Sequence, residues 1–258
     1  MFNSFKTILP ICLTLILSSS AFADNETYTV GTIRVFPPFT RTNEVGIPEG
    51  FDIDLINAIA AKENFNVNFK VQLWRGLLEK LNTGDVDIVA TAVVITPERQ
   101  EKYDFSHPYL DTGWMAVLKE NNQGQQYQTF EEAIANSNNF VTETDGAGEK
   151  EVKNIIAEKS NGKLKTVNST YLGIKDIATS QSDISYDISR VLQYYVYTEQ
   201  MNKRYNLYGL VNPNAKKDHF GFVVKKGRKD LLEKLNRGLK TVHYDGTYDN
   251  IYKKWFKE

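Results

Sequence analysis

The segment Ile95–Arg99, with the sequence ITPER, combines residue types that could bind a small carboxylate. Thr96 is a favourable N-cap, Pro97 suits the first helical position and Glu98 adds negative charge in the first turn, so a helix is predicted to begin here. The first amide groups of a helix lack partners within it and attract an anion. Arg99, one turn in, can point back toward the same end and bind a carboxylate through two parallel hydrogen bonds.

The same residues have a simpler interpretation. Thr96–Arg99 could merely cap a helix at the surface, with Arg99 in a weak ion pair with Glu98 or Asp104. This segment alone does not choose between a carboxylate site and a surface cap.

Signatures of catalysis and metal binding are missing from the sequence. His107, His219 and His243 are widely spaced and lack the pairing of metal ligands. No Gly-x-Ser-x-Gly, His-Glu-x-x-His or Walker phosphate motif occurs. We therefore predict a protein that is not an enzyme and has no catalytic residues, no metal site and no cofactor.

The first 23 residues have the pattern of a secretory signal peptide. Lys6 precedes an apolar run from Ile8 to Leu17, and small residues before Asp24 suit cleavage after Ala23. The apolar run is shorter than the ~20 residues of a membrane span. Cys12, the only cysteine, lies in this segment, so the mature chain is expected to lack thiol chemistry. We expect a soluble protein in the periplasm.

The charge balance argues against nucleic acid as a partner. The chain has 31 basic and 32 acidic residues, and cleavage would remove only Lys6 among them. A nearly neutral protein lacks the basic surface that phosphate binding requires. The roughly 235 residues left after cleavage suit one large domain or two lobes of ~100 residues each.

Predicted strands and helices alternate along the chain, which favours a mostly parallel sheet with helices on its faces and a ligand at the carboxyl ends of the strands. The predicted strands are Ile33–Val35, Val67–Val71, Val86–Val93, Met115–Lys119, Phe140–Thr142, Asp183–Tyr186 and Phe220–Val224. The predicted helices contain Phe51–Ala60, Leu77–Leu81, Val152–Ile156, Ile174–Ala178, Leu231–Leu239 and Ile251–Trp255. Because the pattern starts again after Lys119, two similar lobes are expected.

Seven segments, in this order, resemble motifs of the family 3 periplasmic solute-binding proteins, the polar amino acid receptors of ABC importers: Gly31–Phe39, Gly50–Leu55, Trp74–Leu77, Gly84–Ile88, Ile95–Arg99, Asp104–Tyr109 and Asp245–Tyr248. The resemblance implies an α/β protein with the two-lobed periplasmic binding protein fold of type II. Each lobe would be a mostly parallel sheet flanked by helices, and two hinge strands would join the lobes. Lobe 1 would comprise residues 24–111 and 220–258, and lobe 2 residues 112–219.

The resemblance also implies where a ligand binds. The residue matching Arg99 holds the α-carboxylate of an amino acid, those matching Phe36 and Trp74 cover its two sides, and the one matching Asp187 holds its ammonium group. The other implied ligand-binding residues are Thr91, Ala92 and Val94 in the first lobe and Gly146, Ala147 and Gly148 in the second.

Physical arguments support several of these assignments. Gly146–Gly148 lies between a strand and a helix, so its amides could approach an anion closely and offer a second helix start to the same carboxylate. An ordinary flexible turn is the alternative, and Glu151 at the third glycine's place excludes the dinucleotide pattern. Phe36 and Trp74 could form apolar walls of a site or simply pack in the core.

The chain departs from the family pattern at three positions. Most relatives have Ser or Thr at the positions of Val94 and Gly148, and many have an aspartate at that of Ile33. A hydrogen bond to a charged group contributes about 1.5 to 3 kcal/mol, so the missing hydroxyl at Val94 would weaken binding of an ordinary amino acid. The carboxylate half of the site is therefore better defined than the amine half.

The sequence leaves open, by one position, which residue would bind the ammonium group of the ligand. Depending on a one-residue gap, either Asp187 or Tyr186 would face the cleft, and Asp187 could instead cap the helix through Val191. Glu143 and Glu149 are further acids near the second lobe's loop, so a cationic or amine-bearing ligand is compatible with the sequence.

We therefore expect a binding protein, monomeric, that captures a small amino acid or related carboxylate between closing lobes and delivers it to the membrane permease of an ABC importer. One alternative is a periplasmic enzyme of the same fold, similar to cyclohexadienyl dehydratase, with Glu149 or Asp187 as general acid. Another is a ligand-sensing module for a membrane receptor.

Overall fold

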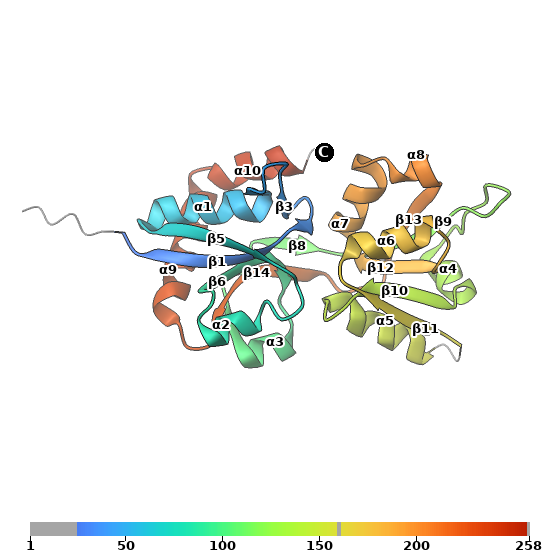
Figure 1. The fold of residues 1–258 in the computed structure, drawn as a ribbon, viewed down its shortest axis with the longest axis horizontal. Helices are drawn as coiled ribbons and strands as arrows, with labels where there is room; N and C mark the ends of the chain where they lie inside the picture. Colours follow the sequence, from blue (N-terminus) through green and yellow to red (C-terminus); the bar gives the residue numbers. More distant parts are fainter. Residues whose placement is uncertain (1–24, 159–160, 257–258) are drawn as a thin grey trace, which may run out of the picture.

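The computed structural model describes residues 25–158 and 161–256, which form two lobes, each built around a β-sheet (Figure 1). The predicted signal peptide, residues 1–23, lies outside the described residues. Within the described ranges, no helix combines the length and apolar character needed to span a lipid bilayer.

The first lobe contains a sheet with the strand order β5-β1-β6-β14-β7, and β8 also pairs with β14. Strands β5, β1 and β6 are parallel, whereas β14 runs antiparallel to β6. Every residue of β6 is buried, as expected of a strand covered on both faces. The strands are β1 (Thr27–Ile33), β5 (Asn66–Gln72), β6 (Ile88–Val94), β7 (Tyr103–Phe105), β8 (Leu110–Thr112) and β14 (Asp218–Lys225), with a small separate sheet of β2 (Val35–Phe36), β3 (Thr40–Thr42) and β4 (Pro48–Glu49).

Helices cover both faces of this sheet, with α1 and α10 above it and α2 and α3 below it in Figure 1. The predicted helix Leu77–Leu81 begins later, at Glu79, because the preceding residues form turns. It ends as expected at Gly84, which has a φ of 77°. The helices are α1 (Phe51–Glu63), α2 (Glu79–Thr83), α3 (Pro97–Lys102), α9 (Lys229–Tyr244) and α10 (Thr247–Trp255).

The second lobe contains a sheet with the order β11-β10-β12-β9-β13, in which β11, β10 and β12 are parallel and β9 is antiparallel to both its neighbours. The fold is the predicted α/β type, with mixed sheets because each combines three parallel strands with antiparallel ones. The elements are β9 (Trp114–Lys119), α4 (Phe130–Asn136), β10 (Asn139–Glu143), α5 (Ala147–Glu158), β11 (Lys163–Val167), α6 (Thr170–Ala178), β12 (Ile184–Ile188), α7 (Ser189–Gln193), the π-helix η1 (Tyr194–Thr198), α8 (Met201–Tyr205) and β13 (Leu207–Val211).

The chain crosses between the sheets twice. It passes from β8 to β9 at Gly113 and returns between β13 and β14 through residues 212–217. The indole nitrogen of Trp114 donates a hydrogen bond of 2.7 Å to Asp218, which ties the outgoing segment to the returning one. Two adjacent connections of this kind are typical of proteins whose lobes close by a hinge.

An aromatic cluster fixes the loop that carries Phe36. The ring of Phe39 lies 5.0 Å from that of Phe220, and the ring of Phe51 lies 5.0 Å from that of Phe256. Phe36 packs beside Phe39, at 6.1 Å between ring centroids. Because all of these rings except the half-buried Phe256 are buried, burial of apolar area holds this loop against the first sheet.

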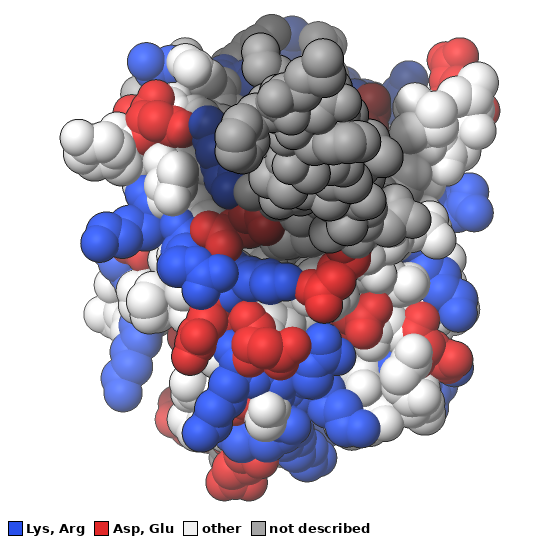
Figure 2. All heavy atoms as spheres, turned by 90° about the vertical axis from the view of Figure 1, so that its left-hand side faces the viewer, with Lys and Arg blue, Asp and Glu red and all other residues white. Residues whose placement is uncertain are grey.

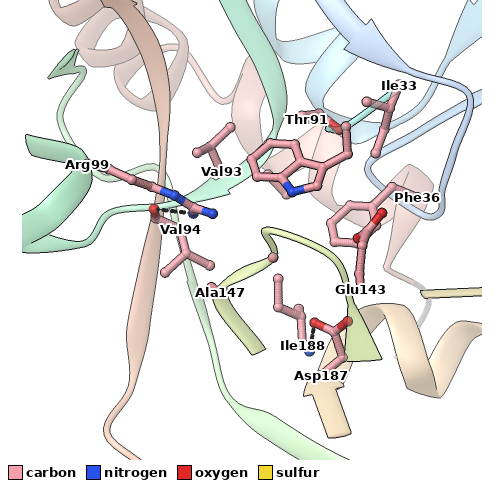
Figure 3. Close-up of a pocket in the computed structure, with 13 residues that line it drawn as sticks. Ile33, Phe36, Thr91, Val93, Val94, Arg99, Glu143, Ala147, Asp187 and Ile188 are labelled. Atoms are coloured by element: carbon pink, nitrogen blue, oxygen red, sulfur yellow. Dashed lines mark hydrogen bonds between the residues drawn. The ribbon is translucent and has the colours of Figure 1, made fainter. Parts of the chain in front are cut away.

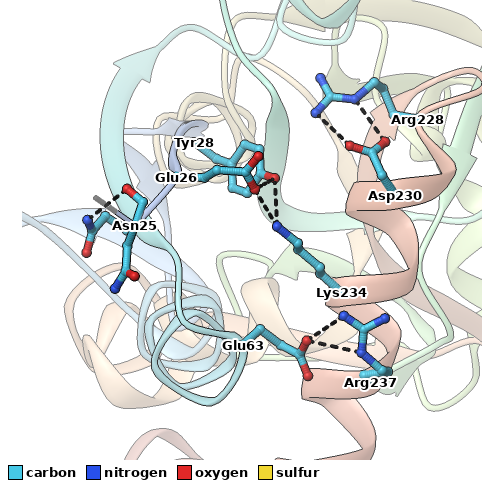
Figure 4. Close-up of polar contacts among 9 residues, drawn as sticks. Asn25, Glu26, Tyr28, Glu63, Arg228, Asp230, Lys234 and Arg237 are labelled. Atoms are coloured by element: carbon cyan, nitrogen blue, oxygen red, sulfur yellow. Dashed lines mark hydrogen bonds and ion pairs between the residues drawn. The ribbon is translucent and has the colours of Figure 1, made fainter. Parts of the chain in front are cut away.

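Helix α9 is attached to the first lobe by surface ion pairs (Figure 4). Lys234 pairs with Glu26, and Arg237 pairs with Glu63 at 2.8 Å. Basic and acidic side chains are interspersed over the described part of the face shown in Figure 2. Exposed pairs contribute only about 0 to 1 kcal/mol each, so the buried face of α9, including Leu235, contributes more to its attachment.

Candidate functional site

A cavity lies between the lobes, at the carboxyl ends of strands from both sheets. It has an empty volume of about 330 Å³, part of it open to solvent. Its lining includes residues at or just after the ends of β1, β5 and β6 in the first lobe and of β10 and β12 in the second. Nine of the ten predicted site residues line it, all except Gly148. This is the location expected for ligands of open α/β sheets.

Arg99 extends its guanidinium from the first turn of α3 into this cavity (Figure 3). The predicted helix start is confirmed, since α3 begins at Pro97 and the Thr96 hydroxyl accepts a hydrogen bond of 3.3 Å from the amide of Arg99. The guanidinium donates to the carbonyl of Val94 at 3.0 Å and lies 5.1 Å from the ring centroid of Trp74. These contacts aim the positive charge and leave other N–H groups for a ligand.

The surface-cap alternative is wrong about the partners of Arg99, although Thr96 does cap α3. Among the described residues, Glu98 pairs with Lys150 and Asp104 pairs with Lys226, and neither pairs with Arg99. Burial lowers the pKa of Arg99 to about 10, so its guanidinium stays charged at neutral pH. Because α3 has only six residues, its aligned dipoles are few, and the guanidinium rather than the helix end provides the positive charge here.

The second lobe approaches Arg99 through the loop before α5. The guanidinium of Arg99 donates to the carbonyl of Asp145 at 3.4 Å, so Arg99 contacts both lobes. Gly146 and Ala147 line the cavity, and the amide of Gly146 donates to the carbonyl of Glu143 in a turn. Helix α5 begins at Ala147, as the glycine-flanked pattern predicts.

Gly148, also predicted as a ligand-binding residue, lies away from the cavity lining. A Cβ atom at this position would lie 2.8 Å from the hydroxyl of Thr142 and 3.0 Å from the carbonyl of Tyr186. Gly148 therefore allows α5 to pack closely against β10 and β12, and a hydroxyl-bearing side chain would not fit without movement of these strands.

Asp187 lines the cavity from β12 and is buried. One of its carboxylate oxygens accepts a hydrogen bond of 2.8 Å from the amide of Ile188, and the other accepts one of 2.9 Å from the hydroxyl of Thr170. Tyr186 faces the other side of the sheet, where its ring stacks on Trp114. Of the two alternatives for the cleft-facing residue, the structure selects Asp187.

Asp187 does not act as a helix cap. Helix α7 begins at Ser189 with Ile188 at its N-cap position, and no side chain caps it. Asp187 thus has no role at the start of α7 that would explain its burial. A buried carboxylate without a cation is costly unless other groups stabilise it.

Glu143, at the end of β10, is a second buried acid in the cavity. The hydroxyl of Thr170 lies 3.3 Å from its carboxylate, so this hydroxyl lies between Glu143 and Asp187. Burial raises the pKa of Glu143 well above its usual value, and the charge of Asp187 raises it further. Burial raises the pKa of Asp187 to about 6. In Figure 3, Glu143 and Asp187 lie on the opposite side of the cavity from Arg99.

Two buried polar atoms of the lining have no partner. The hydroxyl of Thr91 and the indole nitrogen of Trp74 are buried and make no hydrogen bond in the described structure. An unsatisfied buried polar group costs about 1 to 3 kcal/mol, which a hydrogen bond to a ligand would offset.

Asp52, which the sequence did not mark as part of the site, shapes its floor. Its carboxylate accepts hydrogen bonds of 2.5 Å from the amide of Ala92 and of 2.7 Å from the hydroxyl of Tyr109. Ala92 lines the cavity with a φ of 50°, a conformation unfavourable for a residue with a side chain. The bond to Asp52 stabilises this conformation at the end of β6. The only sequence signal was an acid in the second position of a predicted helix.

The cavity lining also contains residues absent from the predicted set: Ile33, Val93, Glu143 and Ile188. These residues lie at or near the ends of predicted strands, but whether their side chains point into the cavity depends on strand register. Among the described residues, no group of three or more His, Cys, Asp or Glu side chains could hold a metal ion.

Two α/β lobes with a cavity between them that contains one cation and two acids are the arrangement of a solute-binding protein. Residues 28–258 match the model of the bacterial extracellular solute-binding proteins, family 3, and the chain belongs to this family. A probable histidine-binding protein of Neisseria gonorrhoeae is 31% identical over 229 residues, covering 89% of this chain and 82% of that protein.

Solved structures show the same fold. An ancestral arginine-binding protein bound to arginine matches with a TM-score of 0.81 and 31% identity, over 90% of this chain and 99% of that one. An ancestral amino acid-binding protein described as a precursor of cyclohexadienyl dehydratase matches with a TM-score of 0.78 and 30% identity, over 90% and 96% of the two chains.

Proposed function

We propose that this protein captures a small amino acid between its lobes in the periplasm and delivers it to the membrane permease of an ABC importer. One observation carries the proposal: a partly buried guanidinium and two buried carboxylates face each other across the interlobe cavity. An α-amino acid carries a carboxylate and an ammonium group one carbon apart, and the cavity has a group of opposite charge for each.

In this proposal, Arg99 binds the α-carboxylate together with the amide of Ala147, since that of Gly146 donates to Glu143, and Asp187 binds the ammonium group. Thr91 uses its free hydroxyl, and Ala92 and Val94 complete the first lobe's wall. Phe36 and Trp74 supply apolar surface on either side, and Gly148 acts indirectly by letting α5 approach. The relatives named above bind histidine, arginine or unspecified amino acids, in support of this ligand class.

The proposed lobes are residues 24–111 and 220–258, and 112–219, with a signal peptide cleaved after Ala23 and a monomeric mature protein. The strand pairing of β8 with β14 and of β9 with β13 supports a division near these boundaries.

Of the two predicted general acids, Glu149 does not line the cavity and pairs with Lys153, so a dehydratase role would have to rely on Asp187. The hydrogen bond from Lys153 lowers the pKa of Glu149, whereas a general acid needs a raised pKa. Turnover of prephenate or arogenate by the mature protein would contradict the binding role.

A thermal-shift screen of the mature protein against the L-amino acids and small organic acids tests the proposal. A ligand at 100 times its Kd adds about 2.7 kcal/mol of stability, which gives a clear rise in Tm. We expect at least one L-amino acid to raise the Tm and the corresponding amine without a carboxylate to leave it unchanged. The proposal is wrong if no amino acid binds.

A further inference from the structure

The cavity contains one more acidic side chain than the ammonium group of an ordinary amino acid would pair with. Its described lining includes one cation, Arg99, and two acids, Glu143 and Asp187. The carboxylate of a bound amino acid pairs with Arg99 and its ammonium group with Asp187. Glu143 is then left without a positive partner, since no ion pair among the described residues involves it.

The protein provides fewer and longer hydrogen bonds to the carboxylate of Glu143 than to that of Asp187. The single hydroxyl hydrogen of Thr170 is closer to Asp187, at 2.9 Å between heavy atoms, than to Glu143, at 3.3 Å. Asp187 also accepts a hydrogen bond from the amide of Ile188. Glu143 is only 6% exposed, so water does little to stabilise its charge.

A second observation indicates that a ligand completes this cavity. Thr91 is only 2% exposed, lines the same cavity, and its hydroxyl has no hydrogen-bond partner. The acids therefore share the cavity with an unsatisfied group on the other lobe, which points to a bound molecule in contact with both lobes.

A second, more open groove adjoins the cavity at Glu143. Ile33, Trp74 and Glu143 line both spaces, and the groove extends along Leu73 and Leu172. A ligand side chain that leaves the first cavity in this direction passes between two apolar residues and a carboxylate. Glu143 is the only acid in the described lining of this groove, which also contains Arg34 and polar residues such as Gln72 and Asn168. A hydrocarbon chain that carries a cation would therefore meet its acidic partner where the two spaces share Ile33, Trp74 and Glu143.

We propose that Glu143 is a specificity-determining residue that binds a cationic group on the ligand's side chain, so that the site selects L-amino acids with basic side chains. This inference rests on the proposed amino acid-binding function. It assigns the side-chain contact to the second lobe, opposite the apolar Ile33 of the first.

Calorimetry with two matched ligand pairs tests the inference. L-citrulline has the shape of L-arginine without its charge, and L-norleucine keeps the carbon chain of L-lysine without the ammonium group. We expect the wild-type protein to bind the cationic member of at least one pair at least tenfold more tightly. Glu143→Gln should reduce that preference at least tenfold and change the affinity for the neutral member less than threefold.

Glu63→Gln is the matched control, because Glu63 pairs with Arg237 on α9, outside the cavity lining. Its ligand preference should equal that of the wild type. Equal wild-type affinity for both members of each pair, or a preference that persists in Glu143→Gln, would overturn the inference and leave amino acid binding intact. If no L-amino acid binds at all, the proposed function falls, and the inference falls with it. If Glu143→Gln folds poorly, equal wild-type affinity for both members of each pair would still overturn the inference.

Discussion

The two lobes present opposite charges to the cavity that they share. Among the described lining residues, the first lobe supplies Arg99 and no acid, whereas the second supplies Glu143 and Asp187 and no base. The first lobe's half is otherwise apolar except for the hydroxyl of Thr91 and the indole nitrogen of Trp74. Each lobe therefore matches one end of an α-amino acid.

This difference couples binding to closure. A buried charge without a partner of opposite charge is unfavourable. Arg99 contacts the second lobe at the carbonyl of Asp145 and does not pair with either acid. A ligand that carries both charges satisfies both lobes at once. We infer that such a molecule stabilises the closed arrangement further, beyond the direct ion pair between Glu98 and Lys150 that already joins the lobes.

The largest expected effect comes from removing the cation. Arg99→Ala should cost roughly 2 to 5 kcal/mol of ligand affinity, because the ligand carboxylate loses its charged partner in a buried site. Calorimetry measures this, with Arg237→Ala as control, since Arg237 lies on α9 and pairs with Glu63. Unchanged affinity in Arg99→Ala would show that the carboxylate is held elsewhere.

The second lobe's half should make the ligand-free protein less stable at high pH. Burial raises the pKa of Asp187 from 3.8 to about 6, so the folded state binds this proton more tightly than the unfolded state. The resulting stabilisation is complete below about pH 3.8 and is lost as the pH rises through about 6. It amounts to about 2 to 3 kcal/mol.

Asp187→Asn should therefore lose less unfolding free energy than the wild type between pH 4 and pH 8. Urea unfolding of both proteins without ligand measures the difference. Asp52, whose pKa burial raises to about 7, contributes in the same direction to both proteins and cancels in the comparison. Glu143 does not cancel, because the charge of Asp187 raises its pKa, and the loss of this effect in Asp187→Asn adds to the expected difference. Parallel pH profiles would mean that Asp187 is not desolvated.

A smaller effect is expected at Val94, which is buried in the first lobe's wall. Val94→Thr introduces a hydroxyl beside the ligand and should raise affinity for amino acids by roughly tenfold, as expected for one added hydrogen bond of about 1.5 kcal/mol. Val45→Thr, at an exposed position outside the cavity lining, is the control and should leave affinity unchanged. Weaker binding by Val94→Thr would mean that this wall requires an apolar surface.

Local signals predicted the position of Arg99, whereas the other residues of the first lobe's wall were implied only by the family resemblance. The start of α3 follows from Thr96 and Pro97 themselves, and the side chain of Arg99 reaches the cavity because a residue one turn into a helix can point back toward its start. The order of strands and helices was likewise visible as periodicity, so the sequence predicted the fold class and the edge of the sheets where the cavity lies.

The second lobe's half depended on contacts distant in the sequence. Whether Asp187 or Tyr186 faces the cleft is set by the register of β12 against β9, where Asp187 pairs with Met115. A one-residue shift would exchange the two side chains. The proximity of Glu143 and Asp187 arises from parallel strands β10 and β12 ending together, which no local pattern encodes.

The most direct test of the central claim is a crystal structure of the mature protein with the amino acid that raises its Tm most. We predict that the ligand carboxylate lies within hydrogen-bonding distance of the Arg99 guanidinium and that the ligand ammonium group lies within hydrogen-bonding distance of Asp187. A ligand bound in the reverse orientation, or outside the interlobe cavity, would contradict it.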